Sequence, residues 1–509
     1  MALTSSLYSG VSGLVNMGNA MQVIGDNISN VNTTGFKAAR TTFQDIMAQS
    51  INTARGGSQV GRGSAMSDVA PLFIQGSFES TSSPTDLAIA GNGFFMVSNP
   101  KIENSIYYTR AGQFHVDKNG YMVNPAGLRV QGWDMEEQPD GSFEIVGSIK
   151  DIEIQNTSPP VATSLATIAV NLDDGAKPVD SNNTLADSWD GSTGDPNGGL
   201  KQNVNYEYKT TFKVYDSLGN THELTVYFDK ELDDPNIQGD ERTWEFLVAM
   251  NPEEDKMPHS DAENNGKLMW GKIQFTPDGQ IEKIFDIFRY NYVNGTETIE
   301  PHLENNTNTN QAFGDHNYPQ IIAFFQPPSG NTDPTTGLDT TAQRIEFSFG
   351  AQAKIDSGTN TVLSWSPETI TTTQYANRSS TLFYDQNGFG AGFLESLSVD
   401  AEGVISGSYS NGRIIALGQL ALARFYSPSD LSKEGGNLWR ETTASGTAIT
   451  GPPRTNGLGS IASNALEQST VDMGTEFVKL ITTQRAFQAN SRVITTTDDM
   501  LNELLNMKR

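Results

Sequence analysis

The two ends of the chain carry long repeats of apolar residues at helical spacing. At the amino end, apolar or small side chains follow a 3-4 spacing at Leu7, Val11, Leu14, Gly18, Met21, Gly25 and Ile28. This spacing places them on one face of a helix. We expect a helix over residues 3 to 30, about 40 Å long. It should end before Gly35, because glycine accepts the left-handed conformation of a helix cap.

The carboxyl end repeats the pattern over a longer stretch. Apolar residues recur every seven positions at Leu466, Met473, Leu480, Phe487, Ile494 and Leu501, and the second seam position holds Phe477 and Leu505. Its other members are Thr470, Gln484, Ser491 and Asp498, so the stripe is narrow and partly polar. We expect a second helix that associates with the first and with other copies. An ordinary helix packed on its own domain is the alternative.

Glycine weakens the first of these helices. Gly10, Gly13, Gly18 and Gly25 fall inside it, and each costs about 1 kcal/mol relative to alanine. Small residues on a seam nevertheless allow close backbone approach. We therefore predict that both ends are largely disordered in the monomer and become helical on assembly.

Between the ends, apolar residues alternate at period two, which is typical of strands. Clear examples are Trp244/Phe246/Val248/Met250 and Ile345/Phe347/Phe349. The run Gly56 to Gly63 lacks the spacing of a phosphate loop and predicts a flexible loop or hinge. The fold class is therefore mixed and mainly β, with paired terminal helices and nested, sandwich-like or barrel-like β domains.

If the terminal helices pair, each outer domain must be built from both ends of the chain. The predicted domains are an inner helical domain of residues 1–34 with 460–509, a hinge region over 35–70, a first β domain of 71–146 with 376–459, and an inserted outer β region of 147–375, with subdivision near 200 and 335 left open.

Charge and composition narrow the partners. The formal net charge of -27 argues against nucleic acid and against an anionic membrane surface. No apolar run approaches the roughly 20 residues that cross a bilayer, so we expect no membrane insertion. The first residues do not form a cleaved secretory signal. Cysteine is absent, which suggests a secreted bacterial protein and excludes thiol chemistry.

No catalytic, cofactor or metal motif stands out. The five histidines, His115, His222, His259, His302 and His316, are far apart in the sequence, and none has the i, i+4 spacing of a helical metal pair. There is no nucleophile elbow and no dinucleotide fingerprint. We expect a protein without catalytic residues, cofactors or metal ligands.

Several motifs nevertheless resemble one known family. The segment from Asp26 to Lys37 resembles the signature of bacterial flagellar rod and hook axial proteins. The supporting segments are 86–97, 108–114, 130–133, 435–439, 476–480 and 484–491. Within the family, a large β insertion such as residues 147–375 is typical of hook proteins rather than rod proteins.

The resemblance implies a structural hook subunit that polymerises into a curved, flexible tube and transmits torque as a universal joint. It implies export through the type III apparatus without a cleaved signal, an extracellular location in the flagellum, and contacts with rod, hook cap and hook-filament junction proteins. A distal rod protein is the nearest alternative. A secreted β-rich adhesin or carbohydrate-active enzyme would require the terminal repeats to be incidental.

Two groups of functional residues follow. The candidate subunit-interface residues are Leu7, Val11, Leu14, Met21, Ile28, Leu466, Met473, Phe477, Leu480, Phe487, Ile494, Leu501 and Leu505. The candidate family-motif and hinge residues are Asn27, Asn30, Asn32, Thr34, Gly35, Phe36, Gly56 and Gly57.

Overall fold

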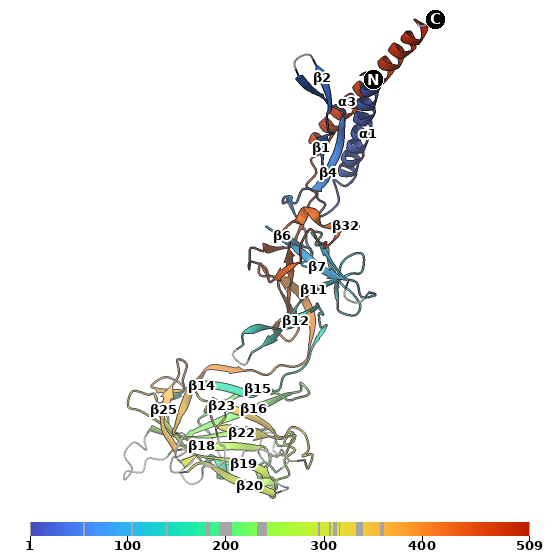
Figure 1. Cartoon of the computed structure of the whole chain (residues 1–509). Helices are drawn as coiled ribbons and strands as arrows, with labels where there is room; N and C mark the ends of the chain where they lie inside the picture. Colours follow the sequence, from blue (N-terminus) through green and yellow to red (C-terminus); the bar gives the residue numbers. More distant parts are fainter. Residues whose placement is uncertain are drawn as a thin grey trace. The chain divides into compact units, whose positions relative to one another are not determined.

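The computed structural model divides the chain into two compact units, described separately below (Figure 1). The helical unit comprises Met1–Thr157 with Phe393–Arg509, and the inserted unit comprises Ser158–Gly392. The structure describes residues 2–53, 56–102, 105–138, 141–179, 184–192, 206–231, 242–293, 296–304, 307–308, 313–314, 316–331, 339–356 and 361–507.

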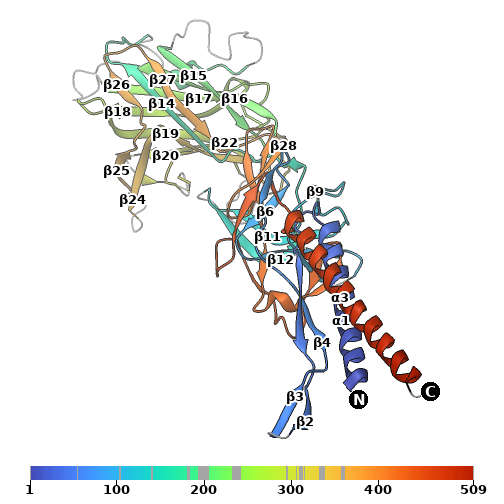
Figure 2. The same ribbon diagram turned by 90° about the horizontal axis from the view of Figure 1, so that it is seen from above.

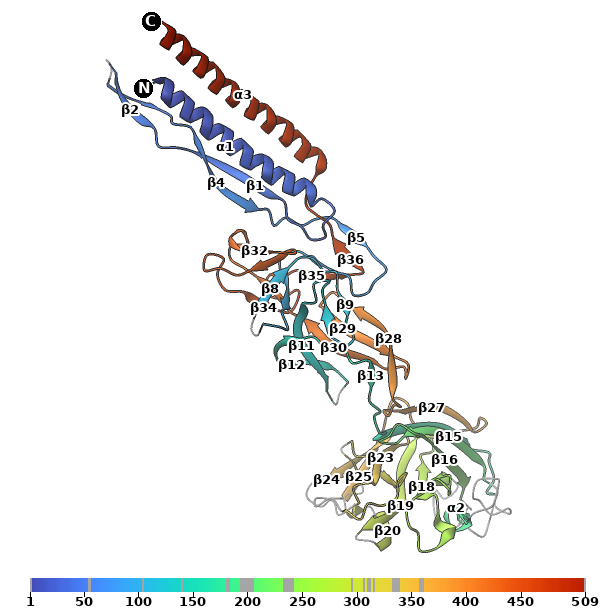
Figure 3. The same ribbon diagram turned by 90° about the vertical axis from the view of Figure 1, so that its right-hand side faces the viewer.

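The predicted fold class is confirmed: the chain is mainly β, and its two long terminal helices are in contact. Helix α1 spans Ala2–Ser29 and α3 spans Met473–Asn506, and the two lie side by side (Figures 2 and 3). They are antiparallel, because Gly10 lies beside Ile494 whereas Asn27 lies beside Glu476. After α1 the chain reverses, with Gly35 at φ +68° as the left-handed residue.

The carboxyl-terminal helix begins later than its heptad pattern predicts. The Asp472 side chain accepts a hydrogen bond from the Thr475 amide at 2.6 Å and so caps the first turn. Leu466 therefore does not belong to the helix. It lies in strand β36 (Ala465–Glu467), which pairs with β5 (Phe78–Ser80). The seven-residue repeat of the sequence therefore extends beyond the start of the helix into a strand.

The segment after α1 forms paired strands. Strand β1 (Ala39–Asp45) pairs with β4 (Ser64–Pro71), and β2 (Gln49–Thr53) pairs with β3 (Gly56–Val60). The loop predicted at Gly56 to Gly63 is therefore a strand over its first five residues. Where β4 passes α1, Asn16 Nδ2 donates to Ser64 Oγ at 2.8 Å. Strands β1 and β4 therefore lie along the helix (Figure 3).

The β part of the helical unit combines early and late segments of the chain. Its main sheet has the order β28-β29-β30-β11-β7-β8-β33-β32, so β11 lies between strands from opposite ends of the sequence. Leu87, Ile89, Phe95 and Leu422 form part of its core. The remaining elements of this part are β6 (Leu87–Ala90), β7 (Phe94–Ser98), β8 (Ile106–Thr109), β9 (His115–Val116), β10 (Met122–Val123), β11 (Arg129–Glu137), β12 (Phe143–Asp151), β13 (Thr157–Ser158), β28 (Gly392–Val399), β29 (Val404–Tyr409), β30 (Ile414–Leu420), β31 (Leu422–Arg424), η3 (Pro428–Asp430), β32 (Ser432–Gly435), β33 (Leu438–Arg440), β34 (Ile449–Gly451) and β35 (Ser460–Ser463).

The inserted unit has two sheets around one main core. The larger sheet has the order β15-β16-β17-β18-β19-β20-β21-β25-β24, and the smaller one centres on β14, which pairs with β23, β26 and β27. The alternating residues Trp244 and Phe246 lie in this core with Phe347 and Phe349, as period two predicts. The elements are β14 (Leu165–Asp173), α2 (Leu185–Ser188), β15 (Tyr208–Tyr215), β16 (Thr221–Lys230), β17 (Thr243–Met250), η2 (Ala262–Asn264), β18 (Lys267–Phe275), β19 (Ile281–Val293), β20 (Thr296–Glu304), β21 (Thr307–Asn308), β22 (Gln320–Ala323), β23 (Gln343–Ser348), β24 (Ala351–Asp356), β25 (Thr361–Pro367), β26 (Thr373–Tyr375) and β27 (Ser380–Gln386).

The helix pair makes a testable distinction between two glycines of α1. A Cβ atom at Gly13 would lie 2.6 Å from Asn490 Nδ2, whereas one at Gly18 would meet nothing within 4 Å. We expect Gly13→Leu to push the helices apart and lower the thermal stability of helical structure. Gly18→Leu removes a glycine and should stabilise α1 by up to about 1 kcal/mol. Thermal melts followed by circular dichroism check this; equal melting of the two variants contradicts it.

Candidate assembly surface

The paired helices expose many large apolar side chains to solvent. Phe477 is 45% exposed, Val478 62% and Ile481 50%, all on the first turns of α3. Further exposed apolar residues of the pair are Tyr8, Val11, Val15, Met473, Phe487, Val493 and Met500. Contiguous exposed apolar surface of this kind typically marks a protein-protein interface. We call the exposed apolar residues of α1 and α3 the helix-pair surface.

The predicted interface residues lie at different depths in this pair. Leu7, Leu14, Met21, Ile28, Leu480, Ile494 and Leu501 are half-buried. Val11, Met473, Phe477 and Phe487 are exposed, and Leu466 is buried in β36. Leu505 lies in α3, but its side chain is outside the described residues. The structure brings Ile494 against α1, where it contacts Gly10.

The side of α1 that is buried within the monomer is a neighbouring stripe. Its buried members are Gly10, Asn16, Ala20, Ile24 and Asn27. The hydrophobic pattern does not predict this stripe, because two of its five members are asparagines and contribute no hydrophobic signal. The predicted seam is consequently only partly covered by the chain itself, which leaves it accessible to other copies.

One asparagine of the family motif joins α1 to both neighbouring elements. Asn27 is 1% exposed. Its side chain pairs with the backbone of Ala39, donating to the carbonyl at 2.8 Å and accepting from the amide at 2.9 Å. Its Nδ2 also lies 3.3 Å from Glu476 Oε2 on α3. An asparagine side chain has the donor and acceptor that this position requires.

The rest of the motif builds the turn after α1. Asn30 Nδ2 donates to the Asp26 carbonyl at 2.9 Å, and the Thr34 carbonyl accepts from Asn437 Nδ2 at 2.9 Å. A Cβ at Gly35 would lie 2.6 Å from the Ala111 amide nitrogen, so glycine is required there by space as well as by φ. Phe36 is buried and Asn32 is exposed. Of the predicted hinge glycines, Gly56 and Gly57 lie in β3.

A buried ionic triad lies beneath this turn. The side chain of Glu467 on β36 is fully buried; its Oε1 is 2.6 Å from Lys37 Nζ and its Oε2 is 3.3 Å from Arg110 Nη1. Backbone groups complete the network, since the Gly76 amide donates to Glu467 Oε1 at 2.8 Å and Lys37 Nζ donates to the Ile74 carbonyl at 2.6 Å. Burial lowers the pKa of the Lys37 ammonium, and the Glu467 carboxylate opposes this effect.

The sequence does not predict this triad. Lys37 and Arg110 fall in segments that resemble the family, and Glu467 has no predicted role. The three positions are far apart in sequence, so their types and spacing carry no signal that they meet. Their burial is therefore information that only the fold supplies.

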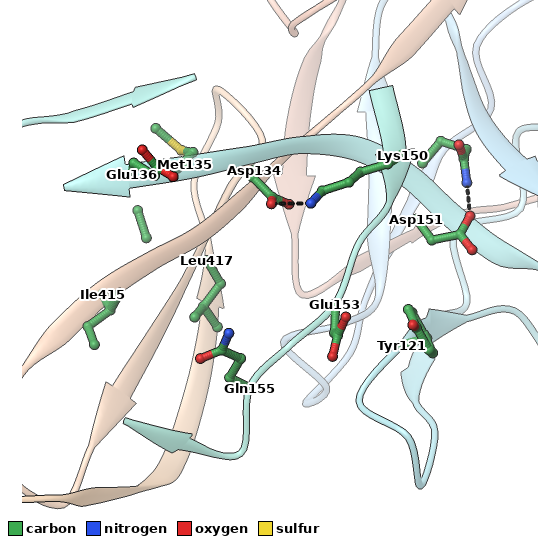
Figure 4. A pocket seen from close by; sticks show the side chains of 12 residues that line it. Tyr121, Asp134, Met135, Glu136, Lys150, Asp151, Glu153, Gln155, Ile415 and Leu417 are labelled. Atoms are coloured by element: carbon green, nitrogen blue, oxygen red, sulfur yellow. Dashed lines mark hydrogen bonds and ion pairs between the residues drawn. The ribbon is translucent and has the colours of Figure 1, made fainter. Parts of the chain in front are cut away.

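The same unit also contains a polar hollow with charged walls. It has a volume of about 710 Å³ and lies between β11, the 151–155 segment and β30 (Figure 4). Two of its charged pairs are ionic: Lys150 pairs with Asp134, and Asp151 lies 2.9 Å from Nη1 of Arg129, which is outside the lining. Among the described residues there is no group of three His, Asp or Glu side chains placed to hold a metal ion. None of the described helices is long and apolar enough to cross a membrane.

Four family models match successive parts of the chain. They are described as flagella basal body rod protein at residues 7–37, flagellar hook protein FlgE/F/G D1 domain at 88–173, flagellar basal body protein FlaE D2 domain at 188–389, and flagellar basal body rod FlgEFG protein C-terminal at 462–507. The matches therefore include both terminal segments that form the helix pair.

Curated relatives match along their whole length. The flagellar hook protein FlgE of Borreliella burgdorferi is 34% identical, and the alignment covers 99% of each chain. The protein of the same name from Treponema pallidum is 32% identical, again over 99% of each. The one from Salmonella typhimurium is 28% identical over 99% of this chain and 100% of the relative.

The buried triad predicts a large loss of stability when its carboxylate is removed. Glu467→Gln leaves two buried cations without their counter-charge and should lower the free energy of unfolding by about 3–5 kcal/mol. The exposed pair between Arg454 and Glu402 is the control. Glu402→Gln should cost about 0–1 kcal/mol. Urea unfolding measures both, and a Glu467→Gln variant as stable as the control contradicts the role of the triad.

Proposed function

This chain belongs to the flagellar hook protein family, and we propose that its helix-pair surface is where subunits polymerise. Full-length relatives at 34% and 32% identity carry the family assignment. The chain is thus a structural subunit of the flagellar hook, an extracellular part of the flagellum, and not an enzyme. The same relatives favour the hook over the alternatives of a distal rod protein, an adhesin or a carbohydrate-active enzyme.

The observation that carries the proposal is the exposure of apolar side chains on α1 and α3. The interior of the pair is partly polar, with Asn490 against Gly13 and Thr497 buried. A contact of this kind holds two helices together weakly, whereas Phe477, Val478 and Ile481 remain in water. Burying such side chains between copies gives roughly 25 cal/mol for each Å² of apolar surface removed from water. Polymerisation therefore supplies the stabilisation that the monomer lacks.

We further propose that each predicted domain of the chain forms a different layer of the hook tube. Residues 1–34 with 460–509 form the inner lining of the tube, residues 71–146 with 376–459 the first β layer, and residues 147–375 the outer layer. The outer layers change their spacing as the curved tube rotates and transmits torque. The strands within residues 35–70 act as the strut between layers. Support for the strut comes from its attachment to α1 through Asn16 and Ser64.

The hook polymer is the partner that the family implies, and we propose four more specific contacts. Models of basal body rod proteins match the terminal segments 7–37 and 462–507. Shared terminal helices give a rod protein and a hook subunit the same stacking surface, so the first hook layer can dock on the rod. The remaining contacts are with the hook cap, the hook-filament junction proteins and the type III export apparatus.

A charge placed on the helix-pair surface should prevent polymerisation. Phe487→Asp introduces a carboxylate on this surface, and Leu480→Asp introduces one at a half-buried seam position of the same helix. Burial of either carboxylate by a neighbouring copy is unfavourable without a partner. Leu363→Asp is the matched control, because Leu363 is 70% exposed in the inserted unit. Electron microscopy of purified protein under polymerising conditions should show tubes only for the control. Tubes of normal appearance from Phe487→Asp and Leu480→Asp would refute the proposal.

The glycines of α1 lead to a second expectation. We propose that the terminal helices are marginal in the monomer and become fully helical on assembly, as export of an unfolded chain requires. Far-ultraviolet circular dichroism of monomer and polymer at equal subunit concentration should show greater helicity in the polymer. Equal helicity in both states would overturn this part of the proposal.

A further inference from the structure

A histidine in the inserted unit is enclosed between two carboxylates. His259 lies in the turn between β17 and β18, and its side chain is completely buried. Its Nδ1 is 2.7 Å from Glu297 Oε1, and its Nε2 is 3.0 Å from Asp255 Oδ2. Asp255 belongs to the same turn, whereas Glu297 belongs to β20. The ring therefore bridges two elements with both of its nitrogens.

Each carboxylate is also fixed by donors from the turn. Asp255 accepts hydrogen bonds from the amides of Met257 at 2.9 Å and Gly266 at 2.8 Å. Glu297 Oε2 accepts from both the amide and the hydroxyl of Ser260 at 2.6 Å. Burial alone raises the pKa of Glu297, but the hydrogen bonds from Ser260 and His259 outweigh it and lower that pKa. The Glu297 carboxyl is therefore ionised and acts as an acceptor.

These contacts require a proton on each ring nitrogen. A neutral imidazole has one N–H and one lone pair, whereas the charged ring has two N–H donors. With a lone pair at either nitrogen, that nitrogen would face a carboxylate oxygen within 3.0 Å in a buried position. Such an arrangement is repulsive where little water screens it.

The surroundings contain few other charges. The Tyr290 ring of β19 meets the His259 ring edge-on at 5.1 Å between centroids, and Met257 and Phe324 form the apolar wall beyond it. Asp261 lies close enough to act on Tyr290, and Lys267 Nζ is 5.7 Å from the Tyr290 ring centre.

The next histidine along this edge is separate. His222 of β16 pairs with Glu254, its Nδ1 lying 2.7 Å from Oε2, and its ring stacks on Phe325. Glu254 precedes Asp255 in the sequence, so the same turn supplies carboxylates to two histidines. The other nitrogen of His222, Nε2, lies 3.5 Å from Asp216 Oδ2, and 12% of the His222 side chain is exposed. The His259 side chain is completely buried, and its two carboxylate contacts are both at 3.0 Å or less.

We propose that His259 is a proton-dependent clamp that fixes the β17–β18 turn to β20, and that this edge of the inserted unit loosens when the ring loses its proton. The turn residues 251–266 are held to β20 by the contacts of His259 and Ser260 with Glu297. Strands β18, β19 and β20 are successive neighbours in the large sheet, so the clamp spans three adjacent strands (Figure 1).

The direction of the pH dependence follows from the environment of the ring. Burial by itself lowers the pKa of His259, but the hydrogen bonds and charges of Asp255 and Glu297 prevail and raise it. A raised folded-state pKa means that the stabilisation is complete below the unfolded value of about 6.5. It is lost as the pH rises through the folded-state pKa. The turn should therefore loosen as the pH rises through a midpoint above 6.5.

Two measurements on the full-length chain test the clamp together. Exchange of the histidine C2 hydrogen, followed by mass spectrometry across a pH series, reports the pKa of each histidine. Amide exchange of residues 251–266, corrected for its intrinsic pH dependence, reports loosening. We expect a His259 midpoint above 6.5, the ordinary value for histidine, and turn exchange that rises through the same midpoint. Each unit of raised pKa corresponds to about a tenfold change in opening across the transition.

Variants separate the clamp from a purely structural histidine. His259→Gln keeps a donor but cannot carry a charge, so its turn exchange should be uniformly faster and independent of pH over this range. His115→Gln is the control and should leave the transition unchanged. Should His259→Gln fail to fold, Glu297→Gln removes one carboxylate and should move the midpoint and the exchange transition together to lower pH. An unshifted transition in Glu297→Gln, or a His259 midpoint at or below 6.5, overturns the proposal.

Discussion

The carboxylate of Glu467 is the interaction on which the arrangement of the helical unit depends. It is fully buried between Lys37, which follows the first helix, and Arg110, which directly follows strand β8 of the main sheet. Its own backbone carbonyl accepts from the Gly35 amide at 2.7 Å. Removing a charge from water is costly unless partners surround it, so the turn after α1, the sheet and β36 must come together in one geometry. This network fixes where both terminal helices leave the β body.

Beyond that anchor, the helices are held by contacts of a different kind. Asn27 ties α1 to β1 and α3 at one end of the pair, while Gly13 and Asn490 meet nearer the other. Such contacts specify the register of the helices and contribute little hydrophobic stabilisation. Ile494 packs against α1, but Phe477, Val478 and Ile481 of α3 remain exposed. The Glu467 network therefore fixes the helical unit where the helices meet the β sheet, while apolar side chains along the helices remain exposed. Contacts with other subunits would bury these side chains.

How far the sequence predicts this architecture depends on the type of signal. Period-two alternation at Trp244 and Phe246 identified the strands of the inserted unit, because burial on one face of a sheet imposes that period. The two terminal helices and their association were predicted from the 3-4 and seven-residue spacing of apolar residues, because burial of one face of a helix imposes that spacing. The ionic triad and the role of Asn27 were not, since polar residues that meet across several hundred positions leave no periodic trace. Leu466 shows the converse error, where a heptad match continued beyond the cap at Asp472 into a strand.

The pairing of α1 with α3 also sets the order in which the molecule can be completed. The partner of the first 29 residues is the last stretch of the chain, and the anchor at Lys37 needs Glu467, 430 positions later. A polypeptide emerging from either end leaves its leading helix without a partner until nearly all of it has emerged. Contacts so remote in sequence form late, because closing a long loop costs entropy before any contact compensates for it. The helix pair is thus the last part of the subunit to form.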